Sequence, residues 1–499
     1  MTDRLPPLAI QADSDLTLDP TDWEEFRELS HRMVDDTIDH LKELRNNVPW
    51  TPTPTIVQET IAREPLPKQA QGARTAYEDF LKNVRPYSVG NRHPRFWGWM
   101  KSNGTPLAMM SEMLAASMNA HLAGFNHAPK LVELQVIKWL ATVMGFPESS
   151  SGILASGGTL ANIIGIAVAR HAQAGFDVRA EGLFARSRMT VYASVEMHSW
   201  LKKGVELLGL GRASFRAIPV DGAWQVDVAA MRRQIKEDRA AGLQPICIVG
   251  SAGTINTGAI DNLDALADLA REQGLWFHID GAIGSMASMS PNLKPLLKGM
   301  ERADSLAFDL HKWGYLPYEI ACVLVRDADK HRAAFETPSP YLQSENRGVL
   351  AGGLVFADRG PELSRGFKAL KAWMTLKAEG TNKIGAVIEQ NVAQARRFAT
   401  ELAAIPEFVI DAPVSLNVVC WRAKPDGSSP EQQDALNREL LVHLQETGVA
   451  ICSSTLLNGR FVIRLAVANH RSRWEDYASL LAALPEALRT CKRAVGFTP

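Results

Sequence analysis

The stretch SLAFDLHKWGY, residues 305–315, sets a lysine just behind an apolar segment that predicts a buried strand. Lysine is normally a solvated surface residue, because burying its charge is costly unless a partner or a covalent bond removes that charge. The position of Lys312 therefore needs a chemical explanation.

Apolar segments alternate with amphipathic ones on both sides of this stretch, from about residue 90 to residue 370. This alternation predicts an α/β fold with a largely parallel sheet that is covered by helices on both faces. Ligands of such sheets bind at the carboxyl ends of the strands. The expected strands are residues 188–194, 217–220, 245–251, 275–280, 305–309 and 321–327.

The N-terminal region differs from this pattern. Residues 22–45 space apolar side chains at helical intervals after an acidic start, which predicts an amphipathic helix. The proline-rich residues 46–67 are expected to be extended. We therefore expect residues 1–90 to form a helical and extended arm that packs on the partner subunit of a dimer.

The C-terminal region predicts a second, smaller core. After a helical stretch near residues 362–404, two alternating apolar runs occur together with helices at 430–447 and 473–489. This pattern is typical of a small α+β domain. The expected boundaries are 91–375 for the large domain and 376–499 for the small one.

Composition excludes several classes of function. The 499 residues are 46% apolar and 22% charged, and 54 basic residues against 55 acidic ones give a net charge of -1. Such a balance attracts neither nucleic acid nor an anionic membrane. Five scattered cysteines without Cys-x-x-Cys spacing predict neither a disulfide framework nor a zinc site. With no apparent export signal or membrane span, we expect a soluble, cytoplasmic protein acting on a small molecule.

A glycine-rich turn is the first candidate for ligand binding. Gly157 and Gly158 would let the backbone approach a ligand closely, and the helix that follows Thr159 would direct free N–H groups at an anion. These residues could hold a phosphate. The alternative interpretation is a plain helix start after a tight turn.

Two further polar side chains follow expected strands. Asp280 ends an apolar strand and is succeeded by small residues that leave space above the sheet, and a buried carboxylate there needs a cationic partner. His198 follows the strand at 188–194, although a lone histidine is often structural. His278 and Asp280 share a strand face, but with no third ligand evident we predict no metal site.

Together these motifs supply an anion cradle, a buried carboxylate, an amine and an imidazole at one edge of a sheet. Pyridoxal phosphate needs this set of groups. Its phosphate would bind the Gly-Gly-Thr turn, its aldehyde would form a Schiff base with Lys312, and Asp280 would keep its ring nitrogen protonated. The lysine is then buried because it is covalently engaged.

The motifs FDLHKWGY, HIDGAIG, SGGTLAN and SVEMHSW resemble those of the group II pyridoxal-phosphate decarboxylases, which include aromatic-L-amino-acid, histidine, glutamate and tyrosine decarboxylases. NRHPRFWGWM and LSRGFKALKAWMTLKAEG extend the likeness over nearly the whole chain. The resemblance implies fold type I, like aspartate aminotransferase, with a seven-stranded sheet, and a homodimer with shared active sites. It also implies decarboxylation of an L-amino acid, aromatic or similar, through an external aldimine and a quinonoid intermediate.

The resemblance assigns roles to individual residues. Lys312 would form the Schiff base, Asp280 would pair with the pyridinium, and His198 would stack on the ring. The remaining cofactor contacts would come from Gly157, Gly158, Thr159, Thr254, Ala282, Asp309 and His311.

A tyrosine bears on the outcome of the reaction. The family carries a tyrosine on a mobile loop about thirty residues after the lysine, and Tyr341 lies 341 − 312 = 29 residues on. In decarboxylases of this kind the tyrosine protonates the α-carbon after carbon dioxide leaves. Relatives that produce an aldehyde by oxidation tend to carry phenylalanine instead.

One residue departs from the pattern. Asp309 stands where aromatic amino acid decarboxylases have asparagine, and an ionised aspartate would repel a phosphate dianion. Aspartate there is similar to the sphingosine-phosphate lyase branch, so a carbon–carbon lyase and an aldehyde-forming oxidase are alternatives to a decarboxylase. The alternative outside the class of enzymes is a homologue without catalytic activity that serves as a binding or assembly protein.

The substrate pocket is less well defined by sequence. Arg464 could bind a substrate carboxylate, but a structural ion pair is favoured because a fixed charge on the departing carboxylate would hinder its loss. Aromatic side chains could form a wall for an aromatic or imidazole substrate, or could be plain core. The candidates are Phe96, Trp97, Trp99, Phe125 and His127.

Overall fold

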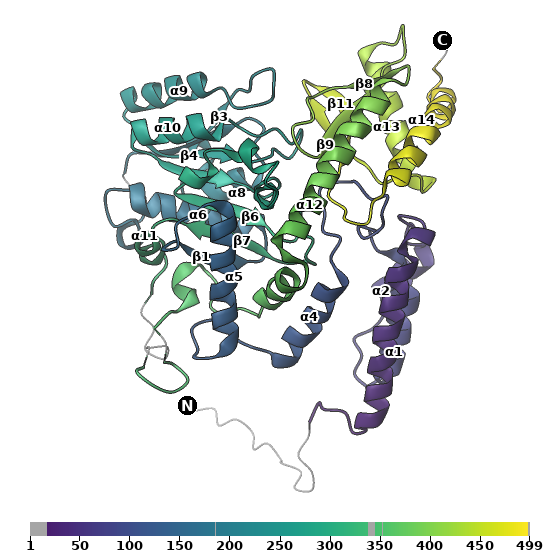
Figure 1. The fold of residues 1–499 in the computed structure, drawn as a ribbon, viewed down its shortest axis with the longest axis horizontal. Coiled ribbons are helices and arrows are strands. Elements are labelled where there is room, and N and C mark those ends of the chain that lie inside the picture. The colour runs from purple at the N-terminus through teal and green to yellow at the C-terminus, as the bar shows by residue number, and fades with distance from the viewer. Residues whose placement is uncertain (1–16, 185, 338–344, 352, 498–499) are drawn as a thin grey trace, which may run out of the picture. The chain divides into compact units, whose positions relative to one another are not determined.

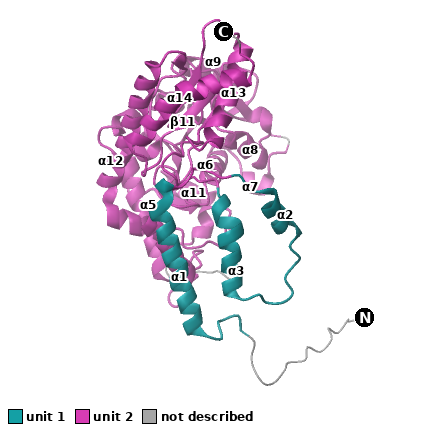
Figure 2. Cartoon of the chain, turned by 90° about the vertical axis from the view of Figure 1, so that its right-hand side faces the viewer, with its two compact units in different colours: residues 1–46, 52–88 teal, residues 47–51, 89–499 magenta. Residues whose placement is uncertain are grey.

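The computed structural model describes residues 17–184, 186–337, 345–351 and 353–497. The chain forms two compact units, one within residues 1–46 and 52–88, and the other within residues 47–51 and 89–499 (Figure 2). Among the described residues, no helix is long and apolar enough to cross a membrane.

The larger unit is built on a seven-stranded sheet with the order β1-β7-β6-β5-β4-β2-β3 (Figure 1). β7 runs antiparallel to both of its neighbours, and the other pairs of adjacent strands are parallel. The predicted α/β class with a mostly parallel seven-stranded sheet is therefore confirmed. The strands are β1 Ser151–Ala155, β2 Met189–Ser194, β3 Phe215–Ile218, β4 Gln244–Ser251, β5 Trp276–Asp280, β6 Ser305–Asp309 and β7 Ala321–Val325.

Helices cover both faces of this sheet. His278 of β5 points at α6 (Gly158–Gln173), where a Cβ on Gly165 would lie 2.5 Å from its ring. The preceding residue, Phe277, lies beside Gly250 of β4, which faces α10 (Leu263–Gln273). Successive residues of a strand point to opposite faces, so α6 and α10 lie on opposite sides. The other α-helices described between residues 91 and 368 are α4 Pro106–Met118, α5 Ala128–Met144, α7 Val178–Glu181, α8 Trp200–Leu207, α9 Val228–Ala240 and α11 Ala328–Ala333.

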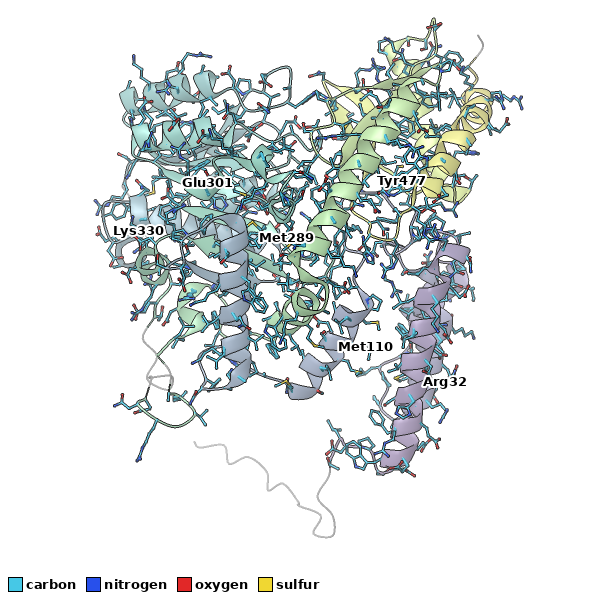
Figure 3. The ribbon with its side chains drawn as sticks, in the orientation of Figure 1. Arg32, Met110, Met289, Glu301, Lys330 and Tyr477 are labelled. Carbon is cyan, nitrogen blue, oxygen red and sulfur yellow. The ribbon has the colours of Figure 1, made fainter. Side chains whose placement is uncertain are left out.

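A second sheet, of four antiparallel strands in the order β10-β11-β9-β8, belongs to the same unit. Its core includes Trp97 and Tyr477, whose rings stack with centroids 4.5 Å apart. Tyr477 is labelled in Figure 3. The strands are β8 Phe408–Ile410, β9 Val418–Ala423, β10 Ser453–Leu457 and β11 Arg460–Ala466, and the helices are α12 Ala369–Ala403, α13 Pro430–Glu446 and α14 Trp474–Ala494. The boundaries 91–375 and 376–499 stay a prediction.

The smaller unit contains α1 Trp23–Lys42, α2 Thr55–Arg63 and α3 Ala73–Asp79. Arg32 of α1 pairs with Glu78 of α3 at 2.5 Å, which joins these two helices (Figure 3). The prediction that residues 46–67 are extended is wrong for residues 55–63, which form α2. Its N-cap is Pro54, and proline is compatible with the start of a helix, where the missing N–H has no helical acceptor.

Candidate active site

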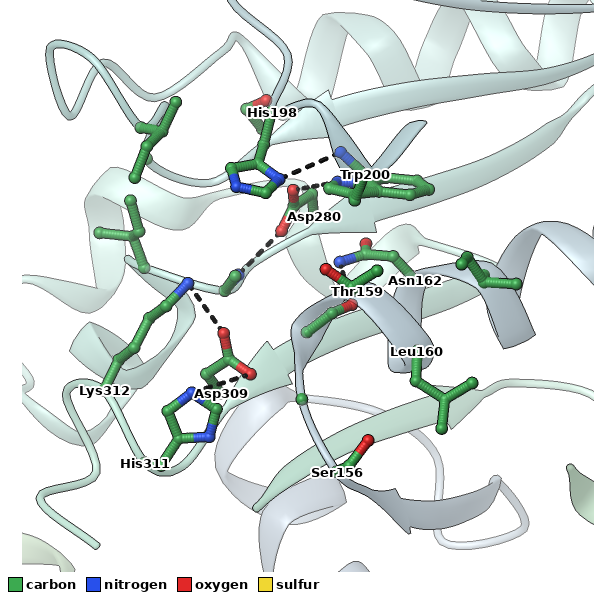
Figure 4. A pocket seen from close by; sticks show the side chains of 18 of the residues that line it. Ser156, Thr159, Leu160, Asn162, His198, Trp200, Asp280, Asp309, His311 and Lys312 are labelled. Atoms are coloured by element: carbon green, nitrogen blue, oxygen red, sulfur yellow. Dashed lines mark hydrogen bonds and ion pairs between the residues drawn. The ribbon is translucent and has the colours of Figure 1, made fainter. Parts of the chain in front are cut away.

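A cavity of about 500 Å³ opens at the carboxyl ends of β4, β5 and β6 (Figure 4). Every predicted site residue within the described part of the chain lines it. These residues are Gly157, Gly158, Thr159, His198, Thr254, Asp280, Ala282, Asp309, His311 and Lys312. The remaining predicted residue, Tyr341, lies outside the described residues.

The glycine turn forms the start of α6, as predicted. Gly157 is the N-cap, and Asn162 Nδ2 donates to the Gly158 carbonyl at 2.7 Å, which fixes the first turn of the helix. A Cβ on Gly158 would lie only 2.7 Å from Asp309 Oδ2, so a larger residue would not fit. Gly157, Gly158 and Thr159 line the cavity at the start of a helix, where free backbone amides can bind an anion.

Trp200 holds the side chains of Asp280 and His198, which line another part of the cavity wall. Its indole Nε1 donates to Asp280 Oδ2 at 2.6 Å, while the Ala282 amide donates to Asp280 Oδ1 at 3.1 Å. The Trp200 backbone amide donates to His198 Nδ1 at 3.1 Å, which leaves the His198 proton on Nε2. Burial lowers the pKa of His198 despite the opposing charge of Asp280, so the imidazole is neutral at neutral pH.

Lys312 lies in the turn after β6, where its side chain is 19% exposed and its Nζ donates to Asp309 Oδ2 at 2.8 Å (Figure 4). Burial alone would lower the pKa of Lys312, but the charges of Asp309 and Asp280 outweigh it and hold that pKa above its ordinary value. Lys312 is therefore an ammonium at neutral pH, with Asp309 as the nearest acceptor for its proton.

His278 is a structural residue. Its Nδ1 lies 2.8 Å from Ser305 Oγ, and its Nε2 lies 2.8 Å from Asn162 Oδ1. Burial lowers the pKa of His278 to about 3, so the ring stays neutral between these partners. Neither nitrogen is available for a metal ion.

One prediction about the substrate pocket needs correction. Arg464 forms no ion pair within the described residues, because its N–H groups bond to the Ile255 and Asn256 carbonyls and to Ser453 Oγ instead. Aromatic residues from the candidate set do not line the cavity that this chain forms by itself. Trp97, for example, is fully buried in the core of the small sheet, where its Nε1 donates to Ser472 Oγ.

The residues at the cavity fit pyridoxal phosphate. The start of α6 offers amides to a phosphate, Lys312 offers an amine to an aldehyde, and the buried carboxylate of Asp280 offers a partner to a ring nitrogen. Asp309 Oδ1 is buried and accepts no hydrogen bond from the described residues, with His311 Nε2 at 3.7 Å, so it can accept a hydrogen bond from a nearby ligand. The fold and this site together define a pyridoxal-phosphate-dependent enzyme of fold type I.

Comparison with known proteins narrows this class. Residues 58–424 match the pyridoxal-dependent decarboxylase conserved domain. The chain is 30% identical to the aromatic-L-amino-acid decarboxylase of Bacillus atrophaeus over 92% of its own length and 94% of the relative's, and 32% identical to tryptophan decarboxylase TDC1 of Camptotheca acuminata over 90% of each. Its structure is similar to that of Oryza sativa TDC with PLP and tryptamine, with a TM-score of 0.87 and 25% identity, covering 95% of this chain and 99% of the other.

The chain belongs to the pyridoxal-dependent decarboxylase family. It is a carboxy-lyase that uses pyridoxal phosphate to remove the carboxylate of an amino acid. The resemblance, the cofactor and fold type I are thereby confirmed.

Trp200 was not predicted, although it stands two residues after His198 in the same motif. Replacing it by phenylalanine should weaken cofactor binding about tenfold or more, because a hydrogen bond to a charged group contributes about 1.5–3 kcal/mol. Titrating the purified variant with pyridoxal phosphate, monitored by the absorbance of the bound cofactor, measures this change. An unaltered dissociation constant would show that the indole N–H does not support Asp280.

Proposed function

We propose that this decarboxylase acts on an aromatic L-amino acid and releases the corresponding amine and carbon dioxide. The observation that carries the proposal is the convergence of Lys312, Asp280 and His198 on one cavity at the ends of the parallel strands. The similarity to aromatic-L-amino-acid and tryptophan decarboxylases supports a substrate with an aromatic side chain.

The charges around the cavity also favour a substrate without an acidic side chain. Lys312 is paired with Asp309, and no arginine is among the described lining residues. The lining also includes the acidic residues Asp280 and Glu319. A second carboxylate on the substrate would therefore find no unpaired cation among the described residues that line the cavity.

When bound, pyridoxal phosphate supplies an aldehyde that takes up an amine and a ring that accepts the electron pair left by the departing carboxylate. Gly158, Thr159 and Thr254 would hold its phosphate. Asp280 is fixed by two donors in a buried position, so it stabilises positive charge placed beside it without having to reorganise. His198, neutral and held through Nδ1, offers a flat face against which a planar group can stack.

Lys312 has to lose a proton from Nζ before it can act as a nucleophile. Asp309 Oδ2, at 2.8 Å, is placed to accept that proton.

A substrate panel tests the proposed activity. The enzyme supplied with pyridoxal phosphate should convert L-tryptophan, L-tyrosine or L-phenylalanine to the amine with one carbon dioxide per turnover, and should act poorly on L-glutamate. Aldehyde formed without amine would instead support the oxidase alternative. Turnover of a phosphorylated amino alcohol by carbon–carbon cleavage would support the lyase that Asp309 suggests.

Tyr341 is proposed to protonate the α-carbon after carbon dioxide has left. Replacing it by phenylalanine removes the proton donor but keeps the ring, so the product should shift from amine towards aldehyde, with ammonia and hydrogen peroxide formed alongside. Oxygen consumption and chromatography of the products measure this shift. Full amine production by the variant would assign the proton to another group.

We further propose that the chain is a cytoplasmic homodimer with shared active sites and that its N-terminal arm packs on the partner subunit. Large apolar side chains are exposed on α4, which is unusual for a surface without a partner. They are Met113, Leu114 and Met118, with Trp99 exposed nearby in sequence. Sedimentation equilibrium should give twice the chain mass, and a monomer that retains full activity would contradict the shared site.

A further inference from the structure

Arg464 joins the two sheets of the larger unit at a point next to the active-site cavity. It lies on β11 of the small sheet and is only 3% exposed. Its Nε donates to the Asn256 carbonyl at 2.9 Å, and its Nη2 donates to the Ile255 carbonyl. Its Nη1 donates to Ser453 Oγ at 3.0 Å within the small sheet. The guanidinium thus binds two consecutive carbonyls of a segment that belongs to the large sheet.

That segment forms part of the cavity wall. It follows β4, and Thr254 and Ile255 line the cavity, while Arg464 binds the carbonyls of Ile255 and Asn256. Within the turn, the Thr254 amide donates to the Ala259 carbonyl, and the Thr254 and Thr257 hydroxyls lie 3.0 Å apart. A shift of the segment would therefore move Thr254 relative to the start of α6 on the other side of the cavity.

Asn256 extends the connection to a second wall. Its Nδ2 donates to Glu196 Oε2 at 2.8 Å, and its Oδ1 accepts from Thr455 Oγ1 of β10 at 2.8 Å. Glu196 stands two residues before His198, in the segment that follows β2. Arg464 and Asn256 therefore connect the small sheet to the loops that carry both Thr254 and His198.

The geometry argues against a direct contact between Arg464 and a substrate. Each recorded hydrogen bond of its guanidinium is made to a neutral oxygen of the protein, and the side chain is not among the described cavity residues. Burying a guanidinium costs free energy, which these hydrogen bonds to neutral oxygens must offset. Charge pairing therefore does not explain why an arginine is buried at position 464. Only the planar fork of arginine can reach two adjacent carbonyls and a hydroxyl at once.

We propose that Arg464 is a positioning residue for decarboxylation, which holds the Thr254 and His198 loops in place from the small sheet. The inference rests on the proposed roles of Thr254 and His198 at the site. Arg464 contributes no group to the reaction itself, and it acts by keeping two walls of the cavity at a fixed separation.

Arg464→Lys tests the proposal, because lysine keeps the charge but is shorter and carries all its donors on one nitrogen, so it cannot reach the three acceptors that Nε, Nη1 and Nη2 of Arg464 bind. In the enzyme supplied with pyridoxal phosphate, kcat should fall on the order of 100-fold, as expected for a displacement of about 1 Å among reacting groups. KM should change much less. The dissociation constant of the cofactor should rise, measured by titration independently of turnover. Glu196→Ala, which breaks only the connection towards His198, should lower kcat less, and the double variant should be no worse than Arg464→Lys alone.

Arg460→Lys is the matched control. Arg460 lies on the same strand, and it bonds to Asp434, Gln433 and the Pro430 carbonyl, away from the cavity. The control should keep kcat and cofactor affinity. A rise in KM alone for Arg464→Lys would show that Arg464 binds the substrate carboxylate, and a lower Tm with unchanged kcat and cofactor affinity would show a purely structural role. Either result overturns the proposal.

Thr254→Val and His198→Gln, measured alongside, separate this inference from the site assignment. If both variants retain wild-type kcat and cofactor affinity, the roles proposed for these two residues are wrong and the positioning role fails with them. If both lose activity while Arg464→Lys does not, only the positioning role is wrong.

Discussion

Replacing Lys312 by alanine should lower turnover by about 10⁵-fold, because the removal of a covalent nucleophile typically reduces kcat by this order of magnitude. Lys312 is the only primary amine among the described residues that line the cavity. Its Nζ is held by Asp309 at 2.8 Å, so alanine removes both the nucleophile and the partner of a buried carboxylate. Steady-state amine production by the variant supplied with pyridoxal phosphate gives the loss directly.

Two further measurements make this prediction specific to the amine. Lys312→Arg keeps a cation beside Asp309 but cannot condense with an aldehyde, so it should be as inactive as the alanine variant while retaining more stability. Borohydride reduction of the wild-type enzyme with its cofactor should add the mass of reduced cofactor to the peptide that contains Lys312. An unchanged peptide mass, or an active Lys312→Ala enzyme, would exclude covalent attachment at this residue.

Much of the active site could be predicted because its residues follow directly from local sequence. Asp280 ends one predicted strand and Lys312 follows the next, and the carboxyl ends of parallel strands meet at one edge of a sheet. Periodicity locates the strands, and therefore it also locates these side chains. The resemblance then supplied roles for residues such as Ala282, which have no chemical signal of their own.

Short strands without a clear pattern were missed. β1, with the sequence SGILA, contains only three apolar side chains and runs into the Gly-Gly turn, so periodicity does not separate it from the loop. It is identified by its antiparallel pairing with β7, in which Ser151 lies opposite Val325. β8 and β10 of the small sheet were missed for the same reason, since pairing partners rather than local composition define them.

Contacts between residues far apart in sequence could not be predicted from spacing. Trp200 is 80 residues from Asp280, and Arg464 is 209 residues from Ile255. Trp97 was a candidate for the substrate pocket by type, but its place opposite Tyr477 is set by the packing of the small sheet. Residue type and spacing indicate which side chains can carry out chemistry, whereas their partners depend on how the complete chain packs.

Asp280→Asn should reduce kcat about 10³-fold, equivalent to ~4 kcal/mol of barrier, while leaving the fold intact. Asp280 is 8% exposed, and its carboxylate accepts hydrogen bonds from Trp200 Nε1 and the Ala282 amide. Asparagine has one acceptor oxygen, so its amide group would face one of these donors and leave it unpaired. More importantly, the variant has no negative charge with which to hold a proton on the ring nitrogen of the cofactor. The kcat of cofactor-saturated enzyme measures this loss.

Asp309→Asn is the matched comparison, because it removes the same charge from the same cavity at the end of the neighbouring strand. Asparagine is the residue that the aromatic amino acid decarboxylases carry there, so this variant should lose at least tenfold less activity than Asp280→Asn. Equal losses would mean that the total negative charge of the cavity, and not the position of Asp280, supports the reaction. The pairing of Asp280 with Trp200 and Ala282 argues for position, since a carboxylate that only balanced the charge of Lys312 would not need two fixed donors.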